Sequence, residues 1–530
     1  MREDIGHNLG EQEEKILLLE KGKRGILNII FGRTMVVAVL LLLQFVVLFA
    51  FFAFLGEYIV IAFGSSFAFS IVMIIILINR TMNPSMKLTW AILILALPIF
   101  GALLYMFVEA DLGHRLLHKR LEYLLKESRP YLPKRELPEA LKEKKRDLYN
   151  LEQYALKHGG FPAYENTEVK YFASGEDKFE ALLCELEKAE KFIFLEYFTI
   201  NEGYMWGRIL NILERKAREG VEVRVMYDGT CSFFLLPNNY PKKLKALGIK
   251  CKPFAPLRPF VSTYYNNRDH RKIAIIDGHT AFTGGVNLSD EYINKKTLHG
   301  HWKDAAIMIR GEAVKSFTLM FLQMWDVDNR VRDYNTYVNV DYKCPGKAEG
   351  YVLPYGDSPL DSERVGEMVY LDIINNAKRY VHIMTPYLIL DYEMLQALTF
   401  AAKRGVEVCI ILPHIPDKKY AFALAKTHYK DLIAAGVKVY EYLPGFIHSK
   451  VFVSDDKRAV VGTINLDFRS LYLHFECAAY MHEVPAIRDI EKDMQETMQI
   501  SKLITMNDVK KEKLSMRLAG ILLKFIAPLM

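Results

Sequence analysis

The hydrophobic positions of the chain change character after about residue 108. Three long apolar runs lie before this point: Met35–Phe54, Ile59–Ile78 and Leu88–Phe107. Each has about the 20 residues that a helix needs to cross the hydrocarbon layer of a bilayer. Glu57 is the only charged residue from the start of the first run to the end of the second. No short apolar core with a small-residue cleavage site marks a removable signal peptide. The pattern predicts two or three transmembrane helices in residues 34–108, after a basic segment at residues 1–33.

Polar and apolar positions alternate in a different way in the rest of the chain. Residues 109–151 are rich in Lys, Arg, Glu and Leu, which predicts a helical connector. Beyond it, amphipathic segments that end in Gly precede short Val- and Ile-rich runs of the kind that is buried in a sheet. This alternation predicts an α/β fold with a mixed, largely parallel sheet that helices cover on both faces.

The same segments occur twice, in the same order. Four pairs match: AREGVEVRVMYD (217–228) with AAKRGVEVCIILP (401–413), LKALGIKCKPF (244–254) with LIAAGVKVYEY (432–442), HRKIAIIDG (270–278) with HSKVFVSDD (448–456), and HWKDAAIM (301–308) with HFECAAYM (474–481). A duplication explains the shared order better than four coincidences do. The chain is therefore predicted to hold two duplicated α/β domains, residues 152–340 and 341–530, in a pseudo-two-fold arrangement.

One of these pairs places a histidine two positions before a lysine. Residues two apart on a strand share a face, so each histidine is expected to project together with its lysine. An aspartate follows each lysine by five positions and stands next to a turn residue, which predicts a supporting role, either orienting a neighbour or fixing the turn. The predicted catalytic set is His270, Lys272, Asp277, His448, Lys450 and Asp455.

Small residues and an asparagine follow each motif. They are Gly284, Gly285 and Asn287 in the first copy, and Gly462, Thr463 and Asn465 in the second. Glycine permits close approach of the backbone to a ligand, and the asparagine amides can bind phosphate oxygens. The inventory suits attack at phosphorus, with one neutral histidine as nucleophile, the other protonated to expel the leaving alkoxide, and lysines to stabilise charge. This chemistry requires no metal and no other cofactor.

The two histidines need opposite protonation states, so each is expected to have an orienting acceptor on its far ring nitrogen. Asp304 and Glu476 are the candidates, because they stand at nearly corresponding places in HWKDAA and HFECAA. A plain surface or hairpin charge is the alternative for each. A zinc site would want further ligands at short spacing, and neither motif offers a convincing set. The six cysteines are scattered without a CxxC pair, as expected of ordinary thiols.

These residues resemble the signature of the phospholipase D superfamily, HxKxxxxD followed by small residues and Asn, twice per site. Within that superfamily the chain is similar to bacterial cardiolipin synthases. The likeness also includes WAILILALPIFGALLY (90–105), NLDFRS (465–470) and the C-terminus MRLAGILLKFIAPLM (516–530). The chain departs from the usual pattern in having Gly285 and Thr463 where many relatives have Ser, and three apolar runs where two spans are usual.

The resemblance implies phosphatidyl transfer between two phosphatidylglycerol molecules. A histidine attacks the phosphorus, glycerol leaves, and a hydroxyl of the second headgroup takes the phosphatidyl group to give cardiolipin. By analogy His270 is the nucleophile and His448 the general acid and then base, although the reverse assignment stays open. The implied location is the cell membrane, as a multi-pass protein with its catalytic domains on the cytoplasmic face. The Lys and Arg counts beside the apolar runs do not decide the sidedness.

Three other functions stay open at this point. A membrane-bound hydrolase of the phospholipase D type differs only in its acceptor, water, and the acceptor is chosen by access rather than by the motif residues. Two intact motifs argue against a silent membrane scaffold. A net charge of +6, mild for 530 residues, and the apolar runs argue against a nuclease and against nucleic acid as a partner. The last 15 residues, 516–530, fit an interfacial amphipathic helix and a buried terminal helix equally well.

Overall fold

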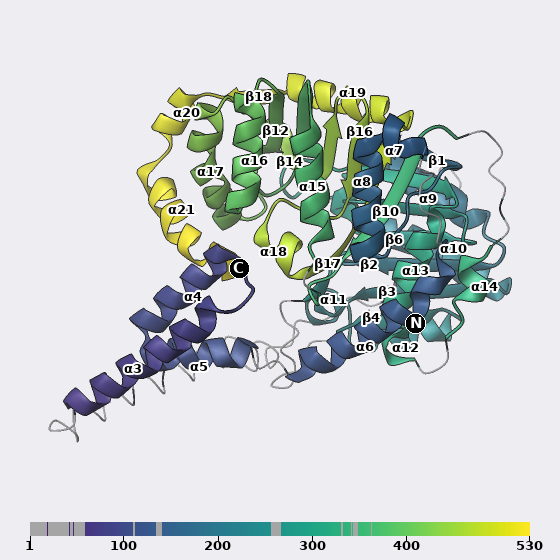
Figure 1. Cartoon of the computed structure of the whole chain (residues 1–530). Helices are drawn as coiled ribbons and strands as arrows, with labels where there is room; N and C mark the ends of the chain where they lie inside the picture. Colours follow the sequence, from purple (N-terminus) through teal and green to yellow (C-terminus); the bar gives the residue numbers. More distant parts are fainter. Residues whose placement is uncertain are drawn as a thin grey trace, which may run out of the picture.

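The two halves of the chain fold into two sheets that lie side by side (Figure 1). The computed structural model describes residues 59–109, 112–133, 140–255, 267–329, 332–340, 348–361 and 363–529, with the single positions 18, 19, 42, 46 and 342. In this part of the chain, strands of both sheets alternate with helices along the sequence.

The two sheets have the same strand order. The first is ordered β1-β9-β7-β6-β2-β3-β4, with bounds Thr167–Phe172 (β1), Phe192–Tyr197 (β2), Glu222–Asp228 (β3), Lys250–Phe254 (β4), Lys272–Ile276 (β6), Thr280–Gly284 (β7) and Ala306–Gly311 (β9). The second is ordered β10-β17-β16-β15-β11-β12-β13-β18, with bounds Tyr351–Asp357 (β10), Tyr380–Met384 (β11), Glu407–Pro413 (β12), Lys438–Tyr442 (β13), Val451–Ser454 (β15), Arg458–Gly462 (β16), His474–His482 (β17) and Ser501–Ile504 (β18). The second sheet repeats the first and adds β18 at its edge, so the predicted duplication is confirmed.

Both sheets are mixed, and the expectation that they are largely parallel is wrong. In the first sheet only the neighbours β2 and β3, and β3 and β4, pair in parallel. In the second the parallel pairs between neighbours in the strand order are β11 with β12 and β12 with β13. The strand after each histidine turns back at once into its neighbour, β6 into β7 and β15 into β16, as an antiparallel hairpin. These hairpins, together with the outer strands β1, β9, β10 and β17, give each sheet an antiparallel side.

Helices cover the sheets and one of them lies between the two halves. The helices of the first half are α9 (Gly175–Glu187), α10 (Tyr204–Arg218), α11 (Gly229–Phe234), α12 (Tyr240–Ala246), α13 (Val314–Trp325) and α14 (Asn335–Val338). Those of the second are α15 (Val365–Asn376), α16 (Tyr392–Lys403), α17 (Lys419–Ala434), α18 (Phe468–Tyr472), α19 (Ala486–Gln499), α20 (Met506–Lys511) and α21 (Leu514–Ile526). Helix α13 contacts β6 of one sheet and β10 of the other. One buried hydrophobic cluster accordingly contains Phe194, Phe317 and Tyr370, so the halves share a core.

The N-terminal helices differ from the prediction. They are α3 (Ile59–Ile78), α4 (Pro84–Ala96), α5 (Pro98–Glu109), α6 (Leu112–Ser128), α7 (Ala140–Lys144) and α8 (Arg146–Tyr154). Among the described residues no helix is both long and apolar enough to cross a bilayer, so the prediction of transmembrane helices is not upheld. The third apolar run is divided in two, because Pro98 cannot donate the hydrogen bond that would continue α4. The first run lies outside the described residues except for two positions.

These N-terminal helices bury part of their apolar surface against one another. Helices α3, α4 and α5 pack together around side chains such as Leu77, Trp90 and Tyr105. Figure 1 shows them projecting from the two-sheet part of the molecule next to the C-terminal helix α21. Two hydrogen bonds hold them there, from Asn83 to the Tyr472 hydroxyl at 2.8 Å and from Thr89 to the Phe525 carbonyl at 2.9 Å. Helices α3, α4 and α5 are thus fastened to the second half of the chain.

Candidate active site

Two very short strand pairs join the halves at the centre of the molecule. Strand β5 (Arg268–Asp269) of the first half runs parallel to the first two residues of β17, and β14 (Gly445–Ile447) of the second half runs parallel to β8 (His301–Lys303). Each pair ends immediately before a motif histidine. The first half thus pairs with the second in the same way as the second pairs with the first, as a pseudo-two-fold relation requires.

The crossing places each histidine beside the carboxylate of the other half. Nδ1 of His270 lies 2.9 and 3.0 Å from the two carboxylate oxygens of Glu476, and Nδ1 of His448 lies 2.7 Å from Oδ2 of Asp304. The backbone repeats the exchange: the His270 amide donates to the Phe475 carbonyl, at 2.9 Å. Because Nδ1 is held by a carboxylate in each ring, Nε2 is the nitrogen left to face a substrate.

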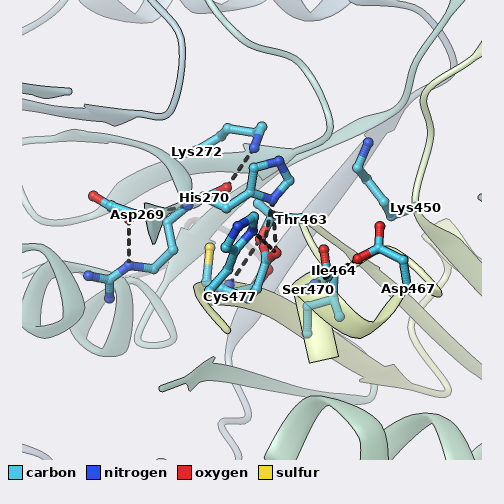
Figure 2. A network of polar contacts seen from close by, with 12 residues as sticks. Asp269, His270, Lys272, Lys450, Thr463, Ile464, Asp467, Ser470 and Cys477 are labelled. Carbon is cyan, nitrogen blue, oxygen red and sulfur yellow. Dashed lines mark hydrogen bonds and ion pairs between the residues drawn. The ribbon is translucent and has the colours of Figure 1, made fainter. Parts of the chain in front are cut away.

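The motif lysines stand next to their histidines. Lys272 donates to the backbone carbonyl of His270 at 2.6 Å, and Lys450 donates to that of His448. In Figure 2 Lys272 and Lys450 enter the site from two different segments of the chain. Both ammonium groups are buried, as a charge that faces a bound anion should be. The predicted His and Lys residues are therefore brought together in one site.

Burial is the largest influence on the charges of this site. It lowers the pKa of Lys272 to about 8 and that of Lys450 to about 7. It also lowers the pKa of His270 well below its ordinary value, with a further contribution from Lys272, and that of His448 to about 4. Both imidazoles are thus neutral near pH 7 without a ligand. An arriving phosphate anion would raise these values again.

The two carboxylates are not equivalent. Burial raises the pKa of Glu476 well above its ordinary value, against the opposing effect of Lys272. Burial acts in the same direction on Asp304, but His448 and Lys450 outweigh it, so that the pKa of Asp304 is lowered. Asp304 is therefore the firmer anion, and His448 has the partner better suited to stabilise an imidazolium.

The positions after each motif differ in how they meet these two carboxylates. A side chain at Gly285 would overlap Asp304, so the site has room only for glycine there. Thr463 stands at the matching position of the other half and donates from Oγ1 to Glu476, a hydrogen bond that opposes the rise of the Glu476 pKa caused by burial. The two departures from the serine of many relatives are thus tied to the carboxylates. Gly284 and Gly462 lie close against a neighbouring strand and do not face open space. A Cβ at Gly284 would overlap Ala306, and a Cβ at Gly462 would overlap Ala478.

The two motif aspartates lie away from the histidines, at the far ends of strands β6 and β15. Asp277 accepts hydrogen bonds from the backbone amides of Glu190, Lys191 and Phe192 at 2.7 to 2.8 Å. Asp455 does the same for residues 378, 379 and 380, at 2.8 to 3.0 Å. Both have positive φ, as their turns require. The sequence left two supporting roles open for these aspartates, orienting a neighbour or fixing the turn. Their hydrogen bonds fit the second role, because they join the turn to the start of the neighbouring strand.

The predicted asparagines are both buried, and Asn287 is already engaged in hydrogen bonds. Oδ1 of Asn287 accepts from the Thr199 amide at 3.0 Å, and its Nδ2 donates to the Tyr292 hydroxyl at 2.7 Å. Asn465 is buried as well, and its Oδ1 has no hydrogen-bond partner among the described residues. One amide proton of Asn287 therefore stays available to a substrate, and phosphate binding by either residue stays a prediction.

A third histidine, which the sequence analysis did not identify as a site residue, lies in the same site. The ring of His474 is 5.3 Å from that of His270, and its Nδ1 is 3.7 Å from Oε1 of Glu476. The only sequence signal is its place at the start of HFECAAYM, opposite His301 of HWKDAAIM. The match with His301 does not by itself indicate a site residue, because His301 lies outside the site. There its Nδ1 contacts the Tyr442 hydroxyl at 2.9 Å.

Two groups of described side chains have ligand atoms close enough to share a metal ion. One consists of His270, His474 and Glu476, and the other, in the second sheet, of His382, Glu407 and Cys409. The first group lies beside Lys272, whose positive charge opposes a cation. In the second, Glu407 is already paired with Lys438 at 2.5 Å. The expected independence from metals stays a prediction.

Comparisons with known proteins agree on the family and the class of fold. The family profile described as "Cardiolipin synthase, PLD-like domain" matches residues 182–325 and 370–498, and that described as "Phospholipase_D-nuclease N-terminal" matches residues 68–108. A cardiolipin synthase of Geobacillus kaustophilus is 34% identical over 87% of this chain and 91% of its own. One of Alkalihalophilus pseudofirmus is 32% identical over 90% and 95%. An uncharacterized protein of Streptococcus mutans is 53% identical over 86% of this chain and 99% of its own.

Among solved structures, phosphatidylserine synthase of Haemophilus influenzae covers 72% of this chain and 98% of its own, with a TM-score of 0.55. At 17% sequence identity this likeness concerns the fold alone.

The position of Asp277 predicts that its loss harms folding rather than chemistry. Asp277→Ala leaves three backbone amides without an acceptor, which is expected to lower the free energy of unfolding by about 2–4 kcal/mol. Denaturant unfolding measures this change, and activity per folded molecule should stay within about threefold. Glu187→Ala, which removes an exposed partner of Arg215 in the same half, is the matched control and should cost less than about 1 kcal/mol. A large loss of activity with unchanged stability would contradict the structural role.

The lowered lysine pKa values predict an alkaline limit to activity. A lysine stabilises a phosphate only while protonated, so kcat/KM should fall as pH rises through about 7 to 8, the values for Lys450 and Lys272. Lys450→Arg keeps its charge and should move the onset of this fall toward about 8, the value of Lys272. The measurement is kcat/KM for a phospholipid substrate against pH, with Lys438→Arg as a control outside the site. The same profile in Lys450→Arg as in the unmodified chain would refute the assignment.

Proposed function

Because the chain belongs to the family of cardiolipin synthases with phospholipase D-like domains, and is therefore a phosphatidyltransferase, we propose that it joins two phosphatidylglycerol molecules. The products are cardiolipin and glycerol. The observation that carries the proposal is the pair of histidines whose Nδ1 atoms are each held by a carboxylate of the opposite half.

The first step forms a covalent intermediate. Nε2 of His270 attacks the phosphorus of the donor lipid while His448, protonated once the bound phosphate has raised its pKa, gives its proton to the glycerol oxygen whose bond to phosphorus breaks. The neutral state of His270, which burial enforces, supports its role as nucleophile. The firmer anion Asp304 beside His448 supports the role of His448 as acid. Glycerol leaves, and the phosphatidyl group stays on His270.

The second step reverses the first with a new alcohol. His448, now neutral, takes the proton of a headgroup hydroxyl of the second phosphatidylglycerol, and that oxygen attacks phosphorus and displaces His270. Lys272 and Lys450 stabilise the charge on the non-bridging oxygens in both steps. The protons balance, since the one that leaves with glycerol is replaced by the one taken from the acceptor.

Lipid substrates place the reaction at a membrane surface, for which we propose the cytoplasmic face on the family resemblance. The C-terminal helix α21 supports contact with a bilayer. It exposes Leu518, Ile521 and Leu522 to solvent and carries Arg517 and Lys524. A helix with exposed apolar side chains and interspersed basic ones suits the interface of an anionic membrane. Such contact would raise the local concentration of both lipids at the site.

Product analysis tests the proposal. The purified chain is incubated with phosphatidylglycerol in mixed micelles with chelator, and cardiolipin, glycerol and phosphatidic acid are quantified together, with a labelled oligonucleotide in parallel. Cardiolipin and glycerol are expected in equal amounts, and His270→Ala and His448→Ala should each lower their rate at least about 10³-fold, because each removes a group that makes or breaks a bond.

Other product patterns would contradict the proposal. Phosphatidic acid with little cardiolipin would make the protein a hydrolase, and a cleaved oligonucleotide would make it a nuclease. Melting curves of both variants provide the control that the loss of rate is not a loss of folding.

A further inference from the structure

His474 is a buried polar side chain without a hydrogen-bond partner in the part of the chain that the structure describes. Its residue is only 7% exposed, and neither ring nitrogen has a hydrogen-bond partner among the described residues. The ring lies 5.3 Å from that of His270 and 6.5 Å from that of Phe198, and its Nδ1 is 3.7 Å from Oε1 of Glu476, beyond hydrogen-bond distance. Buried polar groups without a partner are rare and costly, so a partner from outside the chain is the simplest explanation.

The surroundings of His474 favour an anion as that partner. Arg469, Lys272, Arg268 and Lys418 all act on this imidazole as positive charges, and together with burial they lower its pKa well below the ordinary value. These charges oppose a metal cation, although His474 has metal-ligand spacing to His270 and Glu476. A neutral imidazole in a field of positive charge can donate its N–H to an anionic oxygen.

We propose that His474 binds a phosphodiester oxygen of a lipid substrate, as a third histidine of the site beside the two motif histidines. This inference rests on the proposed function only for the identity of the substrate, because the chemistry that it invokes is the binding of a phosphate. Two sources offer that chemistry: the phosphate that reacts with His270, and the phosphate that the acceptor lipid already carries. His474 contributes an N–H donor and forms no covalent bond.

Two substitutions separate the hydrogen bond from the packing. His474→Phe keeps a ring against His270 and Phe198 but has no donor, and His474→Gln keeps an N–H donor but no ring. His301→Ala is the matched control, because His301 is the counterpart of His474 in the repeat and lies exposed, outside the site. A packing role would be preserved by Phe, and a phosphate-binding role by Gln.

Binding of inorganic phosphate gives a readout that does not depend on turnover. The apparent Kd is measured from the rise in melting temperature with phosphate concentration. His474→Phe is expected to raise this Kd about tenfold or more, while His474→Gln and His301→Ala stay within about threefold of the unmodified chain. An unchanged Kd in His474→Phe would overturn the proposal whether or not cardiolipin is formed.

Two kinetic arms identify the source of the phosphate. A donor with a p-nitrophenol leaving group reports the first step as a burst, and the second step is compared with phosphatidylglycerol and with free glycerol as acceptors. A slower burst in His474→Phe assigns His474 to the reacting phosphate. An unchanged burst with slower transfer to phosphatidylglycerol alone assigns it to the acceptor's phosphate. Inhibition of the unmodified chain by chelator, matched by the loss in His474→Phe, would make His474 a metal ligand and overturn the proposal.

Discussion

The site depends on a single constraint, the exchange of short strands between the halves. The β5–β17 and β8–β14 pairs each extend over only two or three residues. Each ends where the motif histidine of one half meets the carboxylate of the other. Neither half alone supplies a histidine together with its orienting carboxylate. The shared core around α13 holds the two sheets in the register that this exchange needs.

Burial weakens the charges in both halves of the site, and the two carboxylates make the site asymmetric. Desolvation keeps His270, His448, Lys272 and Lys450 from holding their charges firmly without a ligand, so a phosphate anion completes the electrostatics of the site. The halves differ in the carboxylate and in the residue beside it. Gly285 leaves room for Asp304, whereas Thr463 donates to Glu476. Because Asp304 is the firmer anion, His448 has the partner better suited to stabilise an imidazolium.

The sequence predicted the duplication and the two His-Lys motifs because both consist of short sequence segments that occur twice. It also singled out Asp304 and Glu476 through the repeat, but not their exchange between halves, since strands as short as β5 and β8 have no signature of their own. The prediction of transmembrane helices rested on length and apolarity alone. It did not consider that Pro98, which has no backbone N–H, would divide one apolar run into two shorter helices. His474 was missed because its importance lies in what surrounds it after folding.

The central claim is that the attacking histidine of the first half is oriented by the carboxylate of the second, and trapping the covalent intermediate tests it most directly. The unmodified chain, Glu476→Ala and Asp304→Ala are mixed with a p-nitrophenyl ester of phosphatidic acid and quenched within one turnover, and the modified peptide is identified by mass spectrometry. The account predicts the phosphatidyl group on His270, formed at least about tenfold more slowly in Glu476→Ala. It predicts an undiminished first step in Asp304→Ala, since this leaving group needs no proton. An adduct on His448, or a first step that depends on Asp304 and not on Glu476, would contradict it.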